Sequence, residues 1–329
     1  MGFIVNTDLL VQIADLYYLQ NMSQMEIAKT FNISRPTVSR MLAEAKREGI
    51  VDIRIHNPVS VNSDMSRRLR ETTRLKNAIV ISGKYGYKDA LKLSAEAAAK
   101  FLFSVLEDGD TLSIAWGDAI NMFCDSMECK KYSSVTVAQM AGSLGSGNPH
   151  EDGMELALRI SEKLGCRYSN VNSPLFIDNV LVYEHMIAEP TISSAITRAS
   201  RADIAITGIG TVSARSLLVE TGYVDECDMA YVRSQGAVAQ LLAQPFDKHG
   251  SPVPWMNKHV VAAPLSTLRN ARWSIGICAG AYKSEAALAC INAGYINVLI
   301  TDETLALSII MSTERWPNFC SVKELPAEM

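Results

Sequence analysis

Residues 23–49 contain two short helical patterns separated by a tight turn. Ser23 stands three residues before Glu26, the spacing of a capping box in which the two residues satisfy each other's free backbone N–H groups. Ser34 is placed to cap the second helix, and Pro36 falls in its first turn, where a missing N–H costs little. Apolar residues recur at helical spacing along both segments, namely Ile27, Ala28, Phe31, Val38, Met41, Leu42 and Ala45. The pattern predicts a helix-turn-helix, whose second helix has the shape to lie in a DNA major groove.

The second predicted helix has arginine and hydroxyl side chains away from its apolar stripe. A helical hairpin used only for packing is the alternative, but such a hairpin does not need these groups on its outer face. The candidates for contact with base edges or phosphates are Arg35, Thr37, Ser39 and Arg40, whereas Lys46 and Arg47 are candidates for phosphates alone. The candidate DNA-binding set is completed by Ser23, Gln24 and Ser34, which stand at the helix starts.

The segments on either side extend this pattern into a complete small domain. An apolar stripe predicts a preceding helix, formed by Leu9, Leu10, Ile13, Leu16 and Tyr17. After Gly49, residues 50–55 alternate as a short strand would, which predicts the start of a wing. We therefore expect a winged helix-turn-helix DNA-binding domain over residues 1–57.

The low net charge of the N-terminal residues limits how tightly one subunit is expected to bind DNA. The chain has a net charge of −4, and its first 56 residues hold six Lys/Arg against six Asp/Glu. The basic excess is confined to residues 35–54, with five basic against three acidic residues. Because nonspecific affinity comes from phosphate neutralisation, we expect it to be weak for one copy. A homo-oligomer that presents two or more such domains is the more plausible DNA-binding form.

Cysteine and histidine usage argues against a metal site. The seven cysteines form no C-x-x-C pair, and the five histidines are scattered, so neither a metal nor another cofactor is expected. An odd number of unpaired thiols suits a reducing compartment. We find no secretory signal and no apolar run long enough to span a bilayer, so we expect a cytoplasmic protein with no membrane partner.

The remaining residues, 58–329, alternate short apolar strands with helical patterns. A linker-like stretch at 58–63 and a charged, helical connection at 64–76 come first. Strands are predicted at 78–81, 111–116, 135–141, 204–207, 260–263, 274–278 and 298–301, and helices at 89–106, 118–130, 153–164, 190–201, 230–243, 283–292 and 303–313. This alternation predicts an α/β domain with a doubly wound, mostly parallel sheet covered on both faces.

Several predicted strands end in glycine and polar residues, where such sheets bind ligands. These loops follow Trp116, Ala141, Thr207 and Ala279 and include Gly117, Asp118, Gly142, Ser143 and Gly208. Each glycine alone is explained by turn chemistry, but four such loops on one sheet favour a small anionic ligand. Lys283 opens a helix after its glycine loop and is the best candidate to hold a phosphate or carboxylate, the alternative being a solvated lysine.

At this point the chain resembles the SorC/DeoR-type sugar-binding transcriptional regulators nearly end to end. The likeness rests on motifs at 17–28, 34–42, 116–117, 203–210, 236–238, 246–250, 280–283 and 294–303. The resemblance implies a C-terminal domain related to sugar-phosphate isomerases that binds an inducer sugar, polyol or sugar phosphate without converting it. It also implies homo-oligomers, usually tetramers, on operators of carbohydrate catabolic genes. Carried over by position, the effector residues are Gly117, Asp118, Gly142, Ser143, Gln240 and Lys283, and Gly208 of the glycine loops completes the candidate set.

Two positions depart from the family pattern. Asp118 stands where many relatives have a Ser or Thr that holds phosphate, and an aspartate repels phosphate or binds sugar hydroxyls instead. Gln240 replaces a carboxylate with a neutral amide. The lysine that forms a covalent adduct in some relatives is absent near residue 141, so noncovalent binding is expected. The identity and phosphorylation of the ligand stay open.

Two other functions compete with a ligand-controlled regulator. An isomerase, deaminase or lyase of sugar phosphates is suggested by Asp203, Asp247, Asp302 and Lys283, which are able to serve in acid–base or Schiff-base chemistry. Each aspartate also has an ordinary interpretation as a cap or turn residue. The third possibility is an interaction protein with a non-functional pocket.

Overall fold

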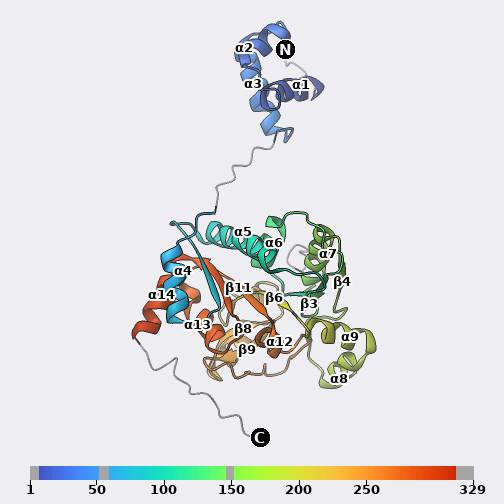
Figure 1. Cartoon of the computed structure of the whole chain (residues 1–329). Helices are drawn as coiled ribbons and strands as arrows, with labels where there is room; N and C mark the ends of the chain where they lie inside the picture. Colours follow the sequence, from blue (N-terminus) through green and yellow to red (C-terminus); the bar gives the residue numbers. More distant parts are fainter. Residues whose placement is uncertain (1–6, 52–58, 146–151, 316–329) are drawn as a thin grey trace. The chain divides into compact units, whose positions relative to one another are not determined.

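The computed structural model describes residues 7–51, 59–145 and 152–315 (Figure 1). The chain divides into two compact units, Met1–Pro58 and Val59–Met329, and each is described by itself. Residues 52–58, on which most of the expected wing strand falls, lie outside the described residues.

The N-terminal unit is built from three helices, α1 (Thr7–Tyr18), α2 (Gln24–Thr30) and α3 (Arg35–Arg47). The Ser23–Glu26 capping box is present, because the Ser23 backbone N–H donates to Glu26 Oε2 at 2.8 Å and the Glu26 N–H donates to Ser23 Oγ at 3.3 Å. The turn between α2 and α3 places Asn32 at φ +52°, a left-handed conformation that asparagine tolerates. The core is formed by Ile13, Ile27, Ala28, Val38 and Leu42. The predicted helix-turn-helix is therefore formed, and the other predicted apolar residues, such as Phe31 and Met41, are partly buried against this core.

The C-terminal unit is organised around a seven-stranded sheet in the order β1-β12-β11-β6-β2-β3-β4. Its strands are β1 (Asn77–Ile81), β2 (Thr111–Ile114), β3 (Thr136–Gln139), β4 (Arg167–Ser169), β6 (Ile204–Gly208), β11 (Trp273–Ile277) and β12 (Val298–Asp302). Every neighbouring pair in the sheet is parallel. The central strands are almost wholly buried, as expected of apolar strands covered on both faces.

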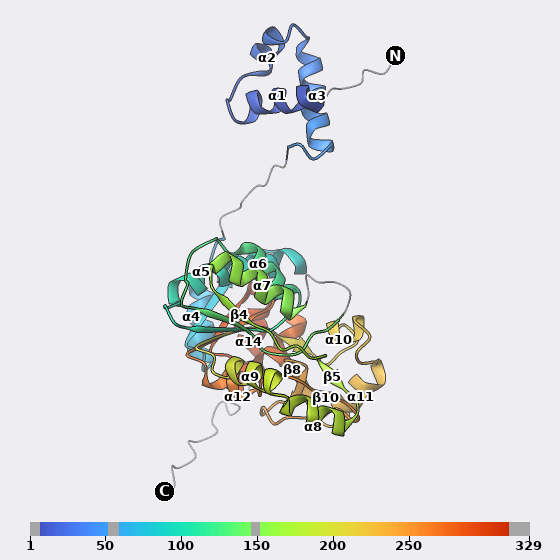
Figure 2. The ribbon, with the colours of Figure 1, turned by 90° about the vertical axis from the view of Figure 1, so that its right-hand side faces the viewer.

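Helices cover both faces of the sheet, as the doubly wound prediction requires (Figures 1 and 2). One face carries α5 (Tyr87–Val105), α6 (Asp118–Ser126) and α7 (Gly153–Leu164). The other face carries α4 (Ser63–Thr72), α9 (Pro190–Ala199), α12 (Ser266–Asn270), α13 (Ser284–Asn292) and α14 (Glu303–Arg315). The linker-like stretch at 58–63 is partly built into this unit, because the Asn62 N–H donates to the Val80 carbonyl at 2.8 Å.

Smaller elements extend from the sheet. A three-stranded antiparallel sheet joins β7 (Gly210–Thr211), β8 (Ala237–Leu241) and β9 (Gln244–Asp247), and a two-stranded one joins β5 (Phe176–Ile177) and β10 (His259–Val260). The remaining helices are α8 (Val180–Ala188), α10 (Leu217–Glu220) and α11 (Glu226–Ser234), and the 3₁₀ turn η2 spans Ala281–Lys283.

Two sequence-based assignments are wrong in this region. The helix expected at 230–243 ends at Ser234, and β8 follows it. Leu242 and Ala243 both adopt positive φ in the turn to β9, a conformation that a helix excludes. Among the described residues, the strand expected at 260–263 is reduced to β10 (His259–Val260), which pairs with β5 outside the central sheet.

The strand order creates one switch point that matters for ligand binding. From β2 the chain continues through α6 to β3 on one side, whereas from β6 it continues to β11 on the other. Because the two connections diverge, they leave a crevice outside the carboxyl ends of β2 and β6.

Candidate functional site

A cavity of about 450 Å³ lies at the switch point. Its polar and aromatic walls are formed by Tyr87, Trp116, Asp118, Thr207, Thr211, Arg215, Ser216, Glu220, Gln240, Tyr282 and Lys283. The rest of the lining comes from Leu91, Ala115, Gly117, Ala119, Gly208, Ile209, Gly210, Leu217, Leu241, Leu242 and Ile277. The volume suits a small molecule, and the mixture of aromatic faces with hydrogen-bonding groups suits a polar one.

The start of α6 forms one wall of this cavity. Gly117 has φ +95° and is the N-cap of α6, without a side-chain cap. The Ile120 and Asn121 N–H groups both donate to the Gly117 carbonyl, which leaves the N–H groups of Asp118 and Ala119 as the free donors of the first turn. Asp118 is exposed and places a carboxylate beside these donors.

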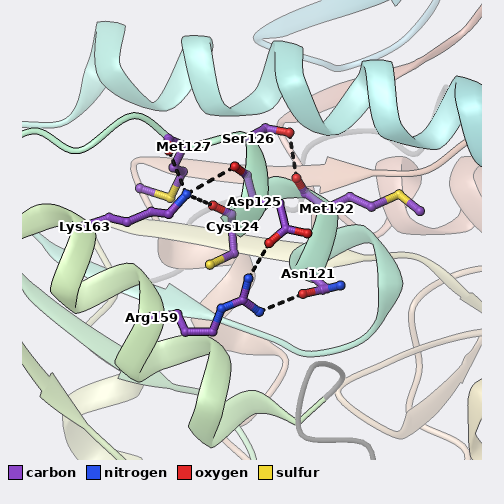
Figure 3. Close-up of polar contacts among 8 residues, drawn as sticks. All are labelled: Asn121, Met122, Cys124, Asp125, Ser126, Met127, Arg159 and Lys163. Atoms are coloured by element: carbon purple, nitrogen blue, oxygen red, sulfur yellow. Dashed lines mark hydrogen bonds and ion pairs between the residues drawn. The ribbon is translucent and has the colours of Figure 1, made fainter. Parts of the chain in front are cut away.

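The opposite end of α6 is held by two basic residues of α7 (Figure 3). Lys163 Nζ donates to the carbonyls of Cys124 at 2.7 Å, Asp125 at 3.2 Å and Met127 at 2.8 Å. Arg159 donates to Asn121 Oδ1 at 2.8 Å and also pairs with Asp125. A cation at a helix C-terminus satisfies free carbonyls and interacts favourably with the helix dipole, so these contacts hold α6 against α7.

Lys283 lies in the cavity wall, between two tyrosines. Its Nζ donates to the Ile209 carbonyl at 2.9 Å and lies 5.8 Å from the ring centre of Tyr87 and 5.9 Å from that of Tyr282. The tyrosine hydroxyls are hydrogen-bonded to each other. Burial raises the pKa of Tyr87 and, together with the hydrogen bond to Tyr87, raises the pKa of Tyr282 to about 12. Both hydroxyls therefore remain neutral donors and acceptors at physiological pH.

Gln240 is held in one orientation. Its Oε1 accepts the Ala243 N–H at 3.1 Å, so its Nε2 is the group presented beside Gly210. A Cβ at position 210 would lie 2.0 Å from this Nε2, so glycine leaves the space in which the amide holds this orientation. The amide therefore serves the cavity as a hydrogen-bond donor.

The structure brings together five of the seven candidate effector residues, namely Gly117, Asp118, Gly208, Gln240 and Lys283. Gly142 and Ser143 do not line this cavity. Gly142 packs against the backbone of Ser173 and Pro174, and the Ser143 hydroxyl donates to Asp152.

Sequence reasoning missed several side chains of the cavity wall, namely Tyr87, Arg215, Ser216, Glu220 and Tyr282. Tyr282 lay in a glycine loop that the sequence had singled out. The others follow no motif and reach the cavity only through the fold.

The outer face of α3 is the candidate nucleic-acid interface. Ser34, Arg35, Ser39 and Arg40 are exposed, whereas Thr37 and Gln24 are half-buried and Ser23 is exposed in its capping box. The Thr37 N–H donates to Ser34 Oγ at 3.3 Å, which caps α3 as predicted. Within residues 7–51, no hydrogen bond or ion pair engages the guanidinium of Arg35 or Arg40. Both are available to an external partner.

The two cations near the end of α3 are exposed but have partners in the chain. Lys46 Nζ lies 5.7 Å from the ring centre of Tyr18. Arg47 pairs with Glu44 and, at 3.5 Å, with Glu48. Exposed pairs of this kind are weak, so a phosphate is able to displace the carboxylates.

The carboxylates that suggested an enzyme hold structural positions. Asp203 accepts the Thr111 N–H at 2.8 Å, and Asp247 accepts the His249 and Ser251 N–H groups at 2.8 Å. Asp302 Oδ1 accepts the Gly280 N–H at 2.8 Å. None of the three is part of the cavity lining.

Among the described residues, no group of three His, Cys, Asp or Glu is placed to hold a metal ion. Within the same residues, no helix is both long and apolar enough to cross a membrane.

The fold and the cavity define a protein that joins a helix-turn-helix to an α/β unit with a ligand-sized cavity at its switch point. Residues 57–311 match the family described as "Putative sugar-binding domain". The chain therefore belongs to this family, among the SorC/DeoR-type transcriptional regulators.

Individual relatives are similar over almost the whole chain. The transcriptional regulator YjhU of Escherichia coli (strain K12) is 29% identical over 308 residues, which cover 92% of this chain and 94% of that protein. The deoxyribonucleoside regulator of Bacillus subtilis (strain 168) is 28% identical over 302 residues, covering 91% and 96%. The crystal structure of the full-length sorbitol operon regulator SorC from Klebsiella pneumoniae has a TM-score of 0.69 at 24% identity and covers 93% of this chain and 99% of that one, which shows the shared fold.

Proposed function

We propose that this chain is a transcriptional regulator of a carbohydrate catabolic operon, controlled by a small molecule. Residues 1–57 bind operator DNA, and residues 58–329 bind a sugar, polyol or sugar phosphate noncovalently and mediate oligomerisation. The observation that supports this best is that one chain combines the exposed Arg35 and Arg40 of α3 with a polar cavity at a strand switch point.

The protein acts in the cytoplasm as a homo-oligomer, with a tetramer as the expected form. Paired recognition helices read half-sites about 34 Å apart or a multiple of that distance, so the assembly supplies the affinity that one weakly basic unit lacks. Ligand binding changes operator affinity through a coupling free energy, typically about 1–3 kcal/mol. Binding without turnover is supported by the positions of Asp203, Asp247 and Asp302, which are engaged elsewhere in the fold and leave Lys283 as the one residue of the enzyme hypothesis in the cavity lining.

Fluorescence anisotropy with a labelled duplex from the chain's own upstream region tests the proposal against a scrambled duplex of equal length. The titrations are run at fixed salt, with and without sugars. Arg35→Ala and Arg40→Ala are each expected to weaken specific binding by about tenfold or more, as loss of a base contact does. Arg201→Ala removes the same charge from an exposed position of the C-terminal unit and serves as the control. Equal affinity for the two duplexes, or normal binding by both arginine variants, would reject the proposal.

A further inference from the structure

The charged side chains that line the cavity balance one another. Asp118 and Glu220 bring two carboxylates, and Arg215 and Lys283 bring two cations. The Lys283 ammonium is already hydrogen-bonded to the Ile209 carbonyl and lies against two aromatic rings. A phosphate dianion would therefore enter a site without excess positive charge, and it would face the two carboxylates of Asp118 and Glu220.

The start of α6 adds a second, independent preference. A free helix N-terminus ordinarily favours an anion, but here Asp118 places its own negative charge beside the free Asp118 and Ala119 N–H groups. A hydroxyl group both donates and accepts, so it is able to donate to the carboxylate and accept from an N–H at the same place. A phosphate ester oxygen only accepts, and Asp118 repels it.

The other fixed groups of the wall offer both kinds of hydrogen bond. Gln240 presents its Nε2 donor, since its Oε1 is occupied by the Ala243 N–H. Tyr87 and Tyr282 line the cavity beside Lys283, and a neutral tyrosine hydroxyl both donates and accepts hydrogen bonds. An uncharged polyhydroxylated molecule satisfies this mixture better than an anion does.

We propose that the ligand is an unphosphorylated sugar or polyol and that Asp118 determines this specificity by accepting hydrogen bonds from its hydroxyls. This inference rests on the proposed function and narrows its ligand class. The alternative, a sugar phosphate bound by Lys283 and Arg215, predicts that wild type binds the phosphate ester more tightly than its parent compound and that inorganic phosphate stabilises wild type specifically.

The test compares wild type with Asp118→Asn, which keeps the shape of the side chain and removes its charge. Asp108→Asn makes the same charge change at an exposed position outside the cavity lining and is the matched control. Thermal unfolding of the full chain is followed with three pairs of compounds at equal ionic strength, namely D-ribose and D-ribose 5-phosphate, D-glucitol and D-glucitol 6-phosphate, and glycerol and glycerol 3-phosphate. Inorganic phosphate, titrated against chloride, serves as a probe that does not depend on the identity of the sugar.

For wild type and Asp108→Asn we expect at least one free sugar or polyol to bind tenfold or more tightly than its phosphate ester. We also expect equal, nonspecific effects of inorganic phosphate on these two proteins. Asp118→Asn is expected to lose most of this discrimination and to gain stabilisation by inorganic phosphate.

The contrary outcomes separate this inference from the proposed function. If an ester binds wild type more tightly than its parent compound, or if Asp118→Asn leaves the phosphate response unchanged, the inference fails and the proposed sensor function stands. If no compound stabilises wild type and phosphate acts alike on all three proteins, the inference fails, and the DNA titrations above decide separately on the proposed function.

Discussion

Asn62 Nδ2 donates a hydrogen bond to Glu303 Oε1 at 2.7 Å, and so connects the first residues of the C-terminal unit to the residue that follows Asp302. Asp302 in turn accepts the Gly280 N–H at 2.8 Å, at the start of the turn that carries Lys283. Asp302 and Glu303, which are consecutive in the chain, thus connect the turn in the cavity wall with Asn62. Asn62 lies shortly after the unit boundary at Pro58. A ligand that displaces the Lys283 turn would act on both hydrogen bonds.

Glu303→Ala is therefore expected to weaken the effect of the ligand on DNA binding. Residues along a coupling route change it by about 0.5–2 kcal/mol, or roughly 2- to 30-fold in the ratio of operator affinities with and without sugar. Ligand affinity in the absence of DNA should stay within about threefold, because Glu303 is outside the cavity lining. Anisotropy titrations with and without sugar measure the ratio.

Two further variants make this expectation specific. Glu285→Ala removes an exposed acidic residue from the first turn of α13 and should leave the ratio unchanged. The double variant Asn62→Asp/Glu303→Gln reverses the donor and acceptor and should restore the ratio, since aspartate also caps α4. Failure of the double variant to restore a ratio lost in Glu303→Ala would argue against this route.

Two glycines of the cavity wall should respond differently to the same substitution. In Gly210→Ala the new Cβ would lie 2.0 Å from Gln240 Nε2, so the flexible amide must move and lose its hydrogen bond with Ala243. In Gly208→Ala the nearest atom is the Ala119 Cβ at 3.6 Å, an ordinary contact. We expect Gly210→Ala to bind sugar about fivefold more weakly, as loss of one hydrogen bond to a polar ligand costs about 1 kcal/mol. Gly208→Ala should bind nearly normally. Calorimetric titration of both variants checks this, and equal affinities would show that Gln240 does not contact the ligand.

Lys163 is expected to stabilise the C-terminal unit through the end of α6. Lys163→Met removes the ammonium that donates to three backbone carbonyls, while it keeps an unbranched side chain. Hydrogen bonds from a charged donor contribute about 1.5–3 kcal/mol, and we expect a loss at the lower end because Lys163 is half-buried. Lys92→Met, at an exposed position of α5, is the control and should change little. Urea unfolding gives both values, and identical midpoints for the two variants would contradict the assignment.

The sequence predicted the elements better than their arrangement. Caps, turn residues and periodicity are local signals, and they located α2, α3 and most strands of the sheet. The helix expected at 230–243 failed because Ala237–Leu241 has a helix-compatible composition, whereas its pairing with β7 and β9 is a tertiary contact.

For the candidate effector residues too, the sequence located the strand ends but not which of them meet in space. Gly142 and Ser143 follow β3, and Gly117 and Gly208 follow β2 and β6, so all four stand at strand ends. Only the spatial order of the strands shows that β2 and β6 flank the switch point and that β3 lies beyond it. Strand order depends on long connections, which leave no pattern in a single sequence.

The capping box of α2 predicts how acid affects the N-terminal unit. Hydrogen bonds from the side chain and backbone of Ser23 lower the pKa of Glu26 below its ordinary value. A carboxylate whose pKa is lower in the folded state stabilises that state above its unfolded pKa, and the stabilisation is lost as pH falls through the folded pKa. We therefore expect α2 to lose protection from amide exchange below about pH 4.5, the ordinary pKa of the group. Glu26→Gln should abolish this pH dependence, whereas Glu48→Gln, with the same charge change in the same unit, should retain it. An NMR titration of the Glu26 carboxyl measures the pKa directly, and an ordinary or raised pKa would contradict the capping box as the cause.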